Sequence, residues 1–181
     1  MKITIDKRGS REYYEEFLFV VSNYRRYRRK PNTKAQTYSK YMRNNYIVIG
    51  LCLLILGLYS YISKDRLYLA LILVCIALLC YTIYYHHNTN EMIKAYLNDT
   101  SIKTLEIDKE GVCYTDPTKS YKLKWENIKY ILINKYSISF IPENASMVVI
   151  STDLEYKDQV FKALKEVNKE NLVVDNSSLY R

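Results

Sequence analysis

The sequence is poor in the residues from which many catalytic and nucleotide-binding motifs are built. Its four glycines stand far apart, at positions 9, 50, 57 and 111, so no glycine-rich phosphate loop can form. Its two histidines are adjacent, and neither a G-x-S-x-G nor an H-E-x-x-H pattern occurs. We therefore predict a protein that is not an enzyme and that holds no cofactor and no metal ion.

The sequence also lacks paired cysteines. Cys52, Cys75 and Cys80 lie in continuous apolar runs, Cys113 lies in an expected strand, and no C-x-x-C spacing occurs. Without metal-ligand spacing or the framework of a short secreted protein, these thiols predict small buried apolar side chains in a reducing compartment.

Charge of either sign is absent from two long apolar runs, Tyr46–Ile62 and Leu67–Tyr85, which have 17 and 19 residues. As helices they would extend about 25 and 28 Å, close to the ~30 Å hydrocarbon core of a bilayer. Only "SKDR", residues 63–66, connects them, which predicts a tight turn. The first run begins too late for a cleavable signal peptide. We expect two transmembrane helices that form a hairpin.

Acidic residues are missing from residues 23–45, which hold eight Lys or Arg. Residues 1–45 carry 12 basic and 4 acidic side chains, so the net charge of +8 is an N-terminal property. The connecting turn holds only Lys64 and Arg66 as basic residues. The positive-inside rule therefore predicts a two-span protein of the cell membrane with both termini in the cytoplasm.

A basic segment beside a bilayer faces the anionic inner leaflet, where each cation near the surface contributes about 1 kcal/mol. Anionic membrane lipids are thus the expected partner of this segment, and nucleic acid is not expected as a partner. The predicted lipid contacts are Arg25, Arg26, Arg28, Arg29, Lys30, Lys34, Lys40 and Arg43.

Small residues recur within both apolar runs. Gly50 and Gly57 are seven residues apart, as are Ala70 and Ala77, so each pair lies on one helical face. In an antiparallel hairpin Gly57 would lie opposite Ala70, and Gly50 opposite Ala77. We expect these four residues to form the helix–helix seam, although the same faces could serve a homo-oligomer.

Two histidines follow the second apolar run, and Glu91 lies four residues after His87. Further ligands are lacking, so we interpret His86 and His87 as interfacial imidazoles that reach solvent rather than as a metal pair.

The N-terminal flank predicts a strand, "MKITID", and a helix that Ser10 caps and that runs to about Arg29. Apolar residues recur along this helix at intervals of three and four, which indicates an amphipathic helix. Its apolar face could dock either on the bilayer or on the C-terminal domain.

Beyond a short helical connector, "EMIKAYL", the pattern changes to period two. At least six short strands follow at hairpin spacing, which predicts one antiparallel sheet that curls on itself. "DKEG" is an expected turn whose glycine can take positive φ. "TDLE", residues 152–155, has the pattern of a capping box before a C-terminal amphipathic helix. We therefore expect an α+β domain at 86–181, after an N-terminal segment at 1–45 and the hairpin at 46–85.

These features together resemble the YcxB-like family of small bacterial membrane proteins. The resemblance covers nearly the whole chain, and its most specific element is the "W-x-x-I" of Trp125–Ile128 before paired apolar strands. It implies a pleckstrin-homology-like cytosolic sheet that a C-terminal helix caps. Members often carry "I-P-K" after the last strand, whereas this chain has Ile150 and Ser151 in "VVISTD". The family implies no particular activity.

From topology we expect a membrane-anchored, non-catalytic binding or scaffolding module that presents its cytosolic domain to a protein partner. The alternative is an oligomerising membrane hairpin that acts in envelope stress or membrane perturbation. An enzyme acting on lipid headgroups would have only His86, His87 and Glu91 to build on.

Overall fold

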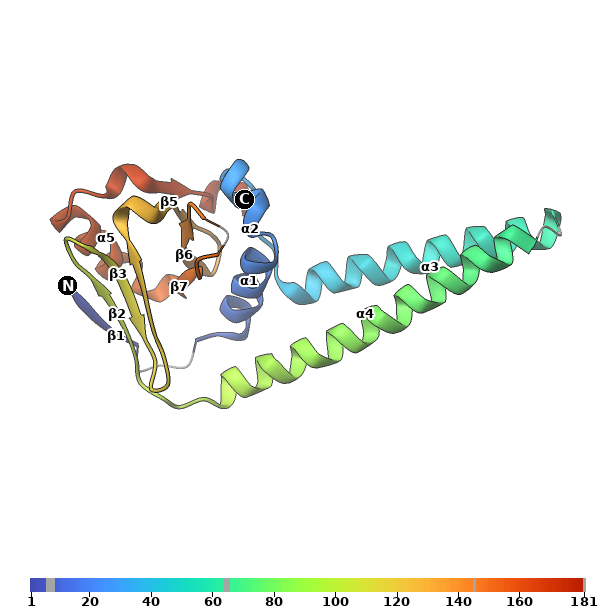
Figure 1. Ribbon diagram of the computed structural model, residues 1–181, viewed down its shortest axis with the longest axis horizontal. Helices are drawn as coiled ribbons and strands as arrows, with labels where there is room; N and C mark the ends of the chain where they lie inside the picture. Colours follow the sequence, from blue (N-terminus) through green and yellow to red (C-terminus); the bar gives the residue numbers. More distant parts are fainter. Residues whose placement is uncertain (6–8, 64–65, 145, 181) are drawn as a thin grey trace. The chain divides into compact units, whose positions relative to one another are not determined.

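The computed structural model describes residues 1–5, 9–63, 66–144 and 146–180 and divides the chain into two compact units (Figure 1). The first unit contains residues 1–37 together with 96–181, and the second contains residues 38–95. This division differs from the expected boundaries at residues 45 and 85, because the N-terminal segment folds with the C-terminal one. The fold is α+β, with two long apolar helices and two sheets.

One sheet of the first unit is antiparallel, with strand order β1-β2-β3-β4. Its strand β1 precedes the hairpin in sequence and β2 follows it, and the two pair with Ile3 opposite Leu105. The expected N-terminal strand is therefore confirmed, although Asp6 lies outside the described residues. The strands are β1 (Lys2–Ile5), β2 (Lys103–Ile107), β3 (Gly111–Thr115) and β4 (Ser120–Lys124).

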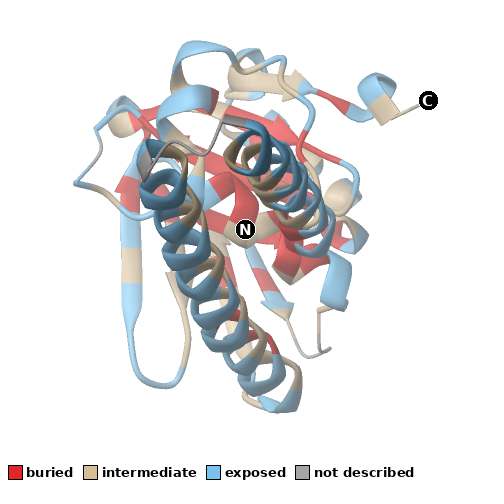
Figure 2. Cartoon of the chain, turned by 90° about the vertical axis from the view of Figure 1, so that its right-hand side faces the viewer, coloured by how far each residue is buried: buried red, intermediate tan, exposed pale blue. Residues whose placement is uncertain are grey.

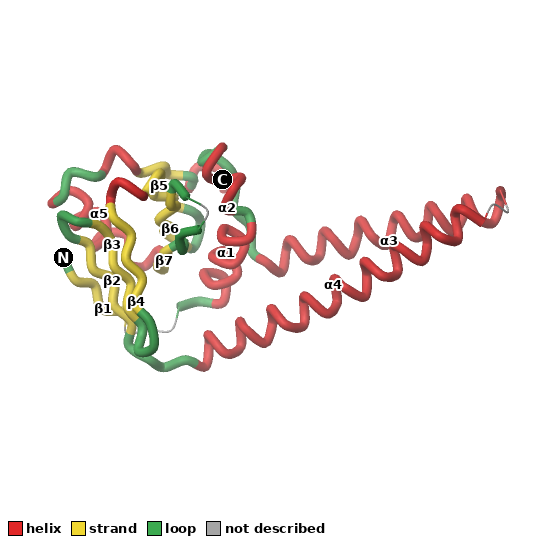
Figure 3. The backbone as a smooth tube through the Cα atoms, viewed as in Figure 1, coloured by secondary structure: helices red, strands yellow, loops and turns green. Residues whose placement is uncertain are grey.

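The other sheet has the order β7-β6-β5-β8, so the single sheet expected from the sequence is wrong. Strand β8 lies parallel to β5 and comes after the C-terminal helix, where its three residues are too few to show a period of two. Figure 3 shows the two groups of strands in one unit. The strands are β5 (Ile128–Ile133), β6 (Ser137–Pro142), β7 (Ile150–Asp153) and β8 (Val173–Asp175).

The main core contains side chains from both sheets and from helix α5 (Lys157–Glu166). Leu105 and Val112 come from the first sheet, Phe140 comes from the second, and Leu164 comes from α5; all four are fully buried. Figure 2 shows this buried interior in red. Removal of this apolar surface from water is the main stabilising contribution to the unit.

The expected capping box lies one residue away from the observed cap. Asp153, not Thr152, accepts a hydrogen bond from the backbone N–H of Glu155 and begins a 3-10 turn before α5. Thr152 belongs to β7 instead, because the strand continues to Asp153.

Helices α1 (Arg11–Ser22) and α2 (Tyr24–Arg29) take the place of the single helix expected as far as Arg29. Ser10 caps α1 as predicted, and its Oγ accepts a hydrogen bond from Tyr13 N at 3.0 Å. The side chain of Tyr27 on α2 is 0% exposed and packs with residues of β5 and β6. These helices therefore cover the second sheet, which is one of the two docking alternatives.

The turn glycine Gly111 does not have positive φ. A Cβ at this position would lie 2.9 Å from the carbonyl carbon of Leu123 and 2.8 Å from Lys124 Cα. The close approach of β4 therefore requires glycine at this position, and the expected left-handed conformation is wrong.

The second unit contains most of α3 (Tyr38–Ser63) and α4 (Arg66–Asn98). Each helix extends beyond its charge-free run, and α4 includes "EMIKAYL" without a break. Both are long and apolar enough to cross a membrane by length and composition, and the most apolar stretch of each is 0% buried (Figure 2). Residues 64 and 65 of the expected turn, with Lys64, lie outside the described part of the chain.

Aromatic rings join α3 and α4 at both ends of the hairpin. Tyr59 stacks on Tyr68 with ring centroids 5.8 Å apart, and Tyr38 stacks on His86 at the same separation. A Cβ placed at Gly50 or Gly57 would meet no atom within 4 Å. The structure therefore gives no support to close packing of these glycines against Ala70 and Ala77, and the seam stays a prediction.

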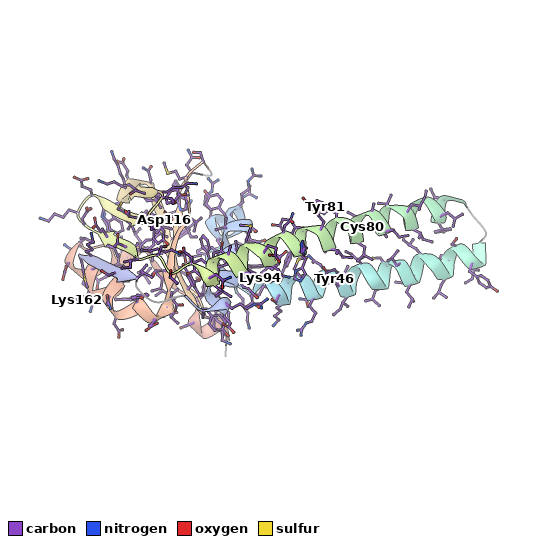
Figure 4. The ribbon with its side chains drawn as sticks, turned by 90° about the horizontal axis from the view of Figure 1, so that it is seen from below. Tyr46, Cys80, Tyr81, Lys94, Asp116 and Lys162 are labelled. Carbon is purple, nitrogen blue, oxygen red and sulfur yellow. The ribbon has the colours of Figure 1, made fainter. Side chains whose placement is uncertain are left out.

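The four cysteines are free thiols, but none is buried as expected. Cys52 and Cys80 are exposed on the hairpin, Cys75 is half-buried there, and Figure 4 labels Cys80. Cys113 lies on the polar side of β3, where its Sγ is 3.3 Å from Ser120 Oγ. The apolar residues around Cys52 and Cys80 in the sequence predicted burial, whereas both side chains lie on the exposed surface of the hairpin.

Candidate binding cavity

The first unit contains a cavity of about 490 Å³ with a largely aromatic lining. The lining comes from α1, the last turn of α4, the strands β2 to β4, the turn between β3 and β4, and the start of β7. Five tyrosines and one phenylalanine contribute to it: Tyr13, Tyr14, Phe17, Tyr96, Tyr114 and Tyr121. This volume and composition are typical of ligand-binding cavities in proteins.

Helix α1, which contributes Tyr13, Tyr14 and Phe17 to the lining, is held in place by the buried polar contacts of Tyr13 and Glu16. The hydroxyl of Tyr13 donates a hydrogen bond to the carbonyl oxygen of Ser151 at 3.1 Å. Glu16 is 1% exposed and accepts hydrogen bonds from Tyr136 N at 2.9 Å and from Ser137 Oγ at 2.8 Å. These contacts attach α1 to the second sheet and thereby position the cavity wall.

A stacked pair of rings forms part of that wall. Tyr14 and Tyr96 lie with centroids 4.0 Å apart and ring planes 7° apart. Lys103 Nζ lies 4.5 Å from the centroid of Tyr96 and 2.9 Å from Asp99 Oδ2. The protein thus already places one cation on an aromatic face beside a carboxylate, an arrangement that ring quadrupoles favour.

Tyr114 on β3 and Tyr121 on β4 lie directly opposite each other in the antiparallel register. Asp116, in the turn that joins these strands, accepts hydrogen bonds from Thr118 N and Thr118 Oγ1, each at 2.7 Å. The hydrogen bond from the Thr118 side chain makes the largest contribution to lowering the pKa of Asp116. Hydrogen bonds from the backbone N–H groups of Thr118 and Lys119 lower this pKa as well. The Asp116 side chain is therefore a carboxylate near neutral pH.

The charged side chains that line the cavity, Asp99, Asp116 and Lys103, have a net negative charge. Burial, together with the nearby carboxylates of Asp116 and Asp99, raises the pKa of Tyr114 to about 12. The pKa of Asp99 is lowered, mainly by the hydrogen bond from the backbone of Ser101 and by the Lys103 ammonium. Two carboxylates and one ammonium thus line the cavity, and Tyr114 stays a neutral phenol.

This arrangement suits binding. Three of the lining tyrosines, Tyr14, Tyr114 and Tyr121, make no hydrogen bond through their hydroxyls to any described residue, so these groups are available to a ligand. Within the described residues no group of three or more His, Cys, Asp or Glu is arranged to hold a metal ion.

The predicted lipid contacts are divided between the two units. Arg25, Arg26, Arg29, Lys30 and Lys34 are exposed on the first unit, whereas Lys40 and Arg43 are exposed on α3 in the second.

Arg28 differs from the other arginines of α2, because its Nη1 donates a hydrogen bond to the carbonyl oxygen of Glu143 at 2.7 Å. Its guanidinium thus helps to hold α2 against the end of β6.

Of the two histidines, His86 packs within the second unit, whereas His87 is exposed. His86 Nε2 lies 3.1 Å from Asn90 Nδ2, and the rings of His86 and Tyr46 form a T-shaped pair with centroids 6.0 Å apart. Glu91 is paired with Lys94 at 2.8 Å.

Sequence reasoning missed the cavity. The helix and strand patterns explain Tyr13, Tyr114 and Tyr121 without a cavity, and the chain holds 20 tyrosines in all, so an abundance of tyrosine does not indicate one. The doublet Tyr13–Tyr14 was the available signal, since an amphipathic helix needs only one of two adjacent residues for its apolar stripe.

Comparisons with protein-family models, with curated proteins and with solved structures found no match to this chain. The resemblance to the YcxB-like family therefore stays an expectation from the sequence.

Proposed function

We propose that this chain is a two-span cell-membrane protein that presents its α+β unit to the cytoplasm as a non-catalytic binding or scaffolding module for a protein partner. The aromatic cavity in the first unit is the observation that carries the proposal. In this interpretation the unit is the pleckstrin-homology-like domain that the YcxB-like resemblance implies.

The proposed topology follows from two features of the chain. Residues 1–37 and 96–181 form one folded unit, so both ends of an inserted hairpin must leave the membrane on the same side. The excess of Lys and Arg before α3 favours the cytoplasmic side. The exposed basic side chains of both units are then available to anionic lipids.

A protein partner is supported by the residues at and near the cavity rim. Val148 lines the cavity and is 47% exposed, and Ile102, between two lining residues, is 62% exposed. Exposed aliphatic side chains beside several tyrosines match the composition of protein–protein interfaces, in which tyrosine is enriched among the energetically dominant residues.

The test is site-specific photo-crosslinking with the full-length chain in intact membranes. A photoreactive amino acid at Val148 should capture a distinct protein, and the adduct should disappear in Tyr121→Ala. The control position is Lys162 on α5, which Figure 4 shows far from Asp116 of the cavity. Recovery of the chain alone from both positions would refute the protein partner.

The orientation is tested with single cysteines in a variant without the four native ones. A membrane-impermeant thiol reagent should modify Lys64→Cys in intact cells and should reach Lys30→Cys only after lysis. Modification of Lys30→Cys in intact cells would place the basic flank outside and overturn the topology.

A second candidate function is that of a membrane-perturbing hairpin that oligomerises. The open space beside Gly50 and Gly57 favours it, because small residues without an intramolecular neighbour can receive another helix. Dye release from liposomes that contain the full-length protein would support this candidate, and intact liposomes would remove it.

A further inference from the structure

We infer that the tyrosine-lined cavity receives a basic side chain of the protein partner, an Arg or a Lys, whose cationic group contacts the aromatic rings near Asp116. This inference rests on the proposed function and names the chemistry that the partner must supply. It assigns to the cavity a charge preference that can be measured without knowledge of the partner.

The charges of the lining favour a cation. Of the two lining carboxylates, Asp99 is already paired with Lys103 at 2.9 Å, whereas no ion pair is found for Asp116 among the described residues. An anionic group of a ligand would meet two carboxylates, and a purely apolar group would bury the negative charge of Asp116 without a cation beside it. A cation instead places an opposite charge beside it.

The aromatic lining favours the same occupant. Lys103 shows that a cation is stable over one of these rings, since its Nζ lies 4.5 Å from the Tyr96 centroid. The remaining rings near Asp116 belong to Tyr114 and Tyr121, whose hydroxyls have no partner among the described residues. A planar guanidinium can stack on such rings while it pairs with a carboxylate, which makes Arg the better fit.

The backbone carbonyl groups of the partner accept hydrogen bonds, and tyrosine hydroxyls of the cavity can donate them. Burial keeps the phenol of Tyr114 protonated, because its pKa is raised to about 12. Neutral tyrosine hydroxyls can donate hydrogen bonds to the carbonyl groups that flank an inserted side chain. A volume of about 490 Å³ leaves room for the side chain together with part of its flanking chain.

The direct test uses two probes of nearly equal shape, benzylguanidinium and neutral benzylurea, with the full-length chain in lipid nanodiscs. Isothermal titration or NMR line broadening should show that the guanidinium binds about tenfold more tightly than the urea, which is the size expected of a partly desolvated cation on aromatic rings. Equal binding of the two probes would overturn the inference.

The decisive variant is Asp116→Asn, because the amide oxygen can still accept the hydrogen bonds from Thr118 that hold the turn. It should abolish most of the guanidinium preference, while Asp158→Asn, an exposed carboxylate on α5, should leave the preference unchanged. Tyr114→Leu should weaken guanidinium binding more than Tyr114→Phe does. An unchanged preference in Asp116→Asn would refute the assigned position.

Competition distinguishes this inference from the function on which it rests. Benzylguanidinium should block the crosslink from Val148, and benzylurea should not. If the crosslink persists under saturating guanidinium, the partner does not use the cavity and the inference is wrong, while the proposed function stands. If no protein is captured but the guanidinium preference holds, the protein partner is refuted and the ligand is a free organic cation.

Discussion

Tyr27 allows the energetic contributions of one ring and one hydroxyl to be separated. Its side chain is 0% exposed among the apolar residues that join α2 to the second sheet, and its hydroxyl has no hydrogen-bond partner in the described part of the chain. Truncation of a buried aromatic ring to Ala typically costs about 3 to 5 kcal/mol. A buried hydroxyl without a partner costs about 1 to 3 kcal/mol.

We therefore expect Tyr27→Ala to lower the free energy of unfolding by about 3 to 5 kcal/mol. Tyr27→Phe should leave stability unchanged or raise it by about 1 kcal/mol, because it removes the hydroxyl and keeps the ring. Tyr27→Ala removes the ring and the hydroxyl, whereas Tyr27→Phe removes the hydroxyl alone, so each variant serves as the control for the other.

Trp125 provides the assay, because it is the only tryptophan and lies in the first unit. It is 8% exposed, and its Nε1 donates a hydrogen bond to the carbonyl oxygen of Asp108 at 2.8 Å. Its fluorescence during urea unfolding of the full-length chain in detergent therefore reports on this unit alone. A loss of more than about 1 kcal/mol in Tyr27→Phe would refute the reasoning, since it would show that the hydroxyl has a partner.

Three further outcomes are expected. Gly111→Ala should lower the same unfolding free energy by about 1 to 3 kcal/mol, because its Cβ would collide with the backbone of Leu123; an unchanged urea midpoint would contradict this. Burial raises the pKa of Glu16 in the folded unit, so its contribution to stability is full below the unfolded pKa and is lost as pH rises through the folded pKa. Glu16→Gln should therefore have a flatter stability profile between pH 4 and 8, and parallel profiles would exclude this. Replacement of Gly50 and Gly57 by Leu should leave the thermal stability of the hairpin unchanged in detergent, because the space beside them is open; a clear loss would instead support the seam expected from the sequence.

The predictions that held depend on local patterns. The cap at Ser10 could be predicted because it joins a side-chain oxygen to a backbone N–H only three residues later, a short-range arrangement that the sequence alone reveals. The strands β2 to β6 follow from alternation and turn residues within a few positions. The two long apolar helices follow from length and absence of charge.

The predictions that failed depend on contacts between distant segments. Strand β8 forms because it can pair with β5 far away in sequence, which its three residues do not reveal. After the helix break at Asn23, Tyr27 packs with Leu132 and Ile141 of the second sheet, residues far away in sequence. The cavity combines tyrosines from α1, β3 and β4 that no local period connects.

The pairing of β1 with β2 constrains how the protein can be made. Ile3 leaves the ribosome before both apolar helices, but its partner Leu105 follows only after these helices have been synthesised. In the nascent chain β1 therefore stays without its partner strand while α3 and α4 are synthesised. Any delay in completing α4 postpones closure of the first sheet and leaves an open strand edge for other chains to join.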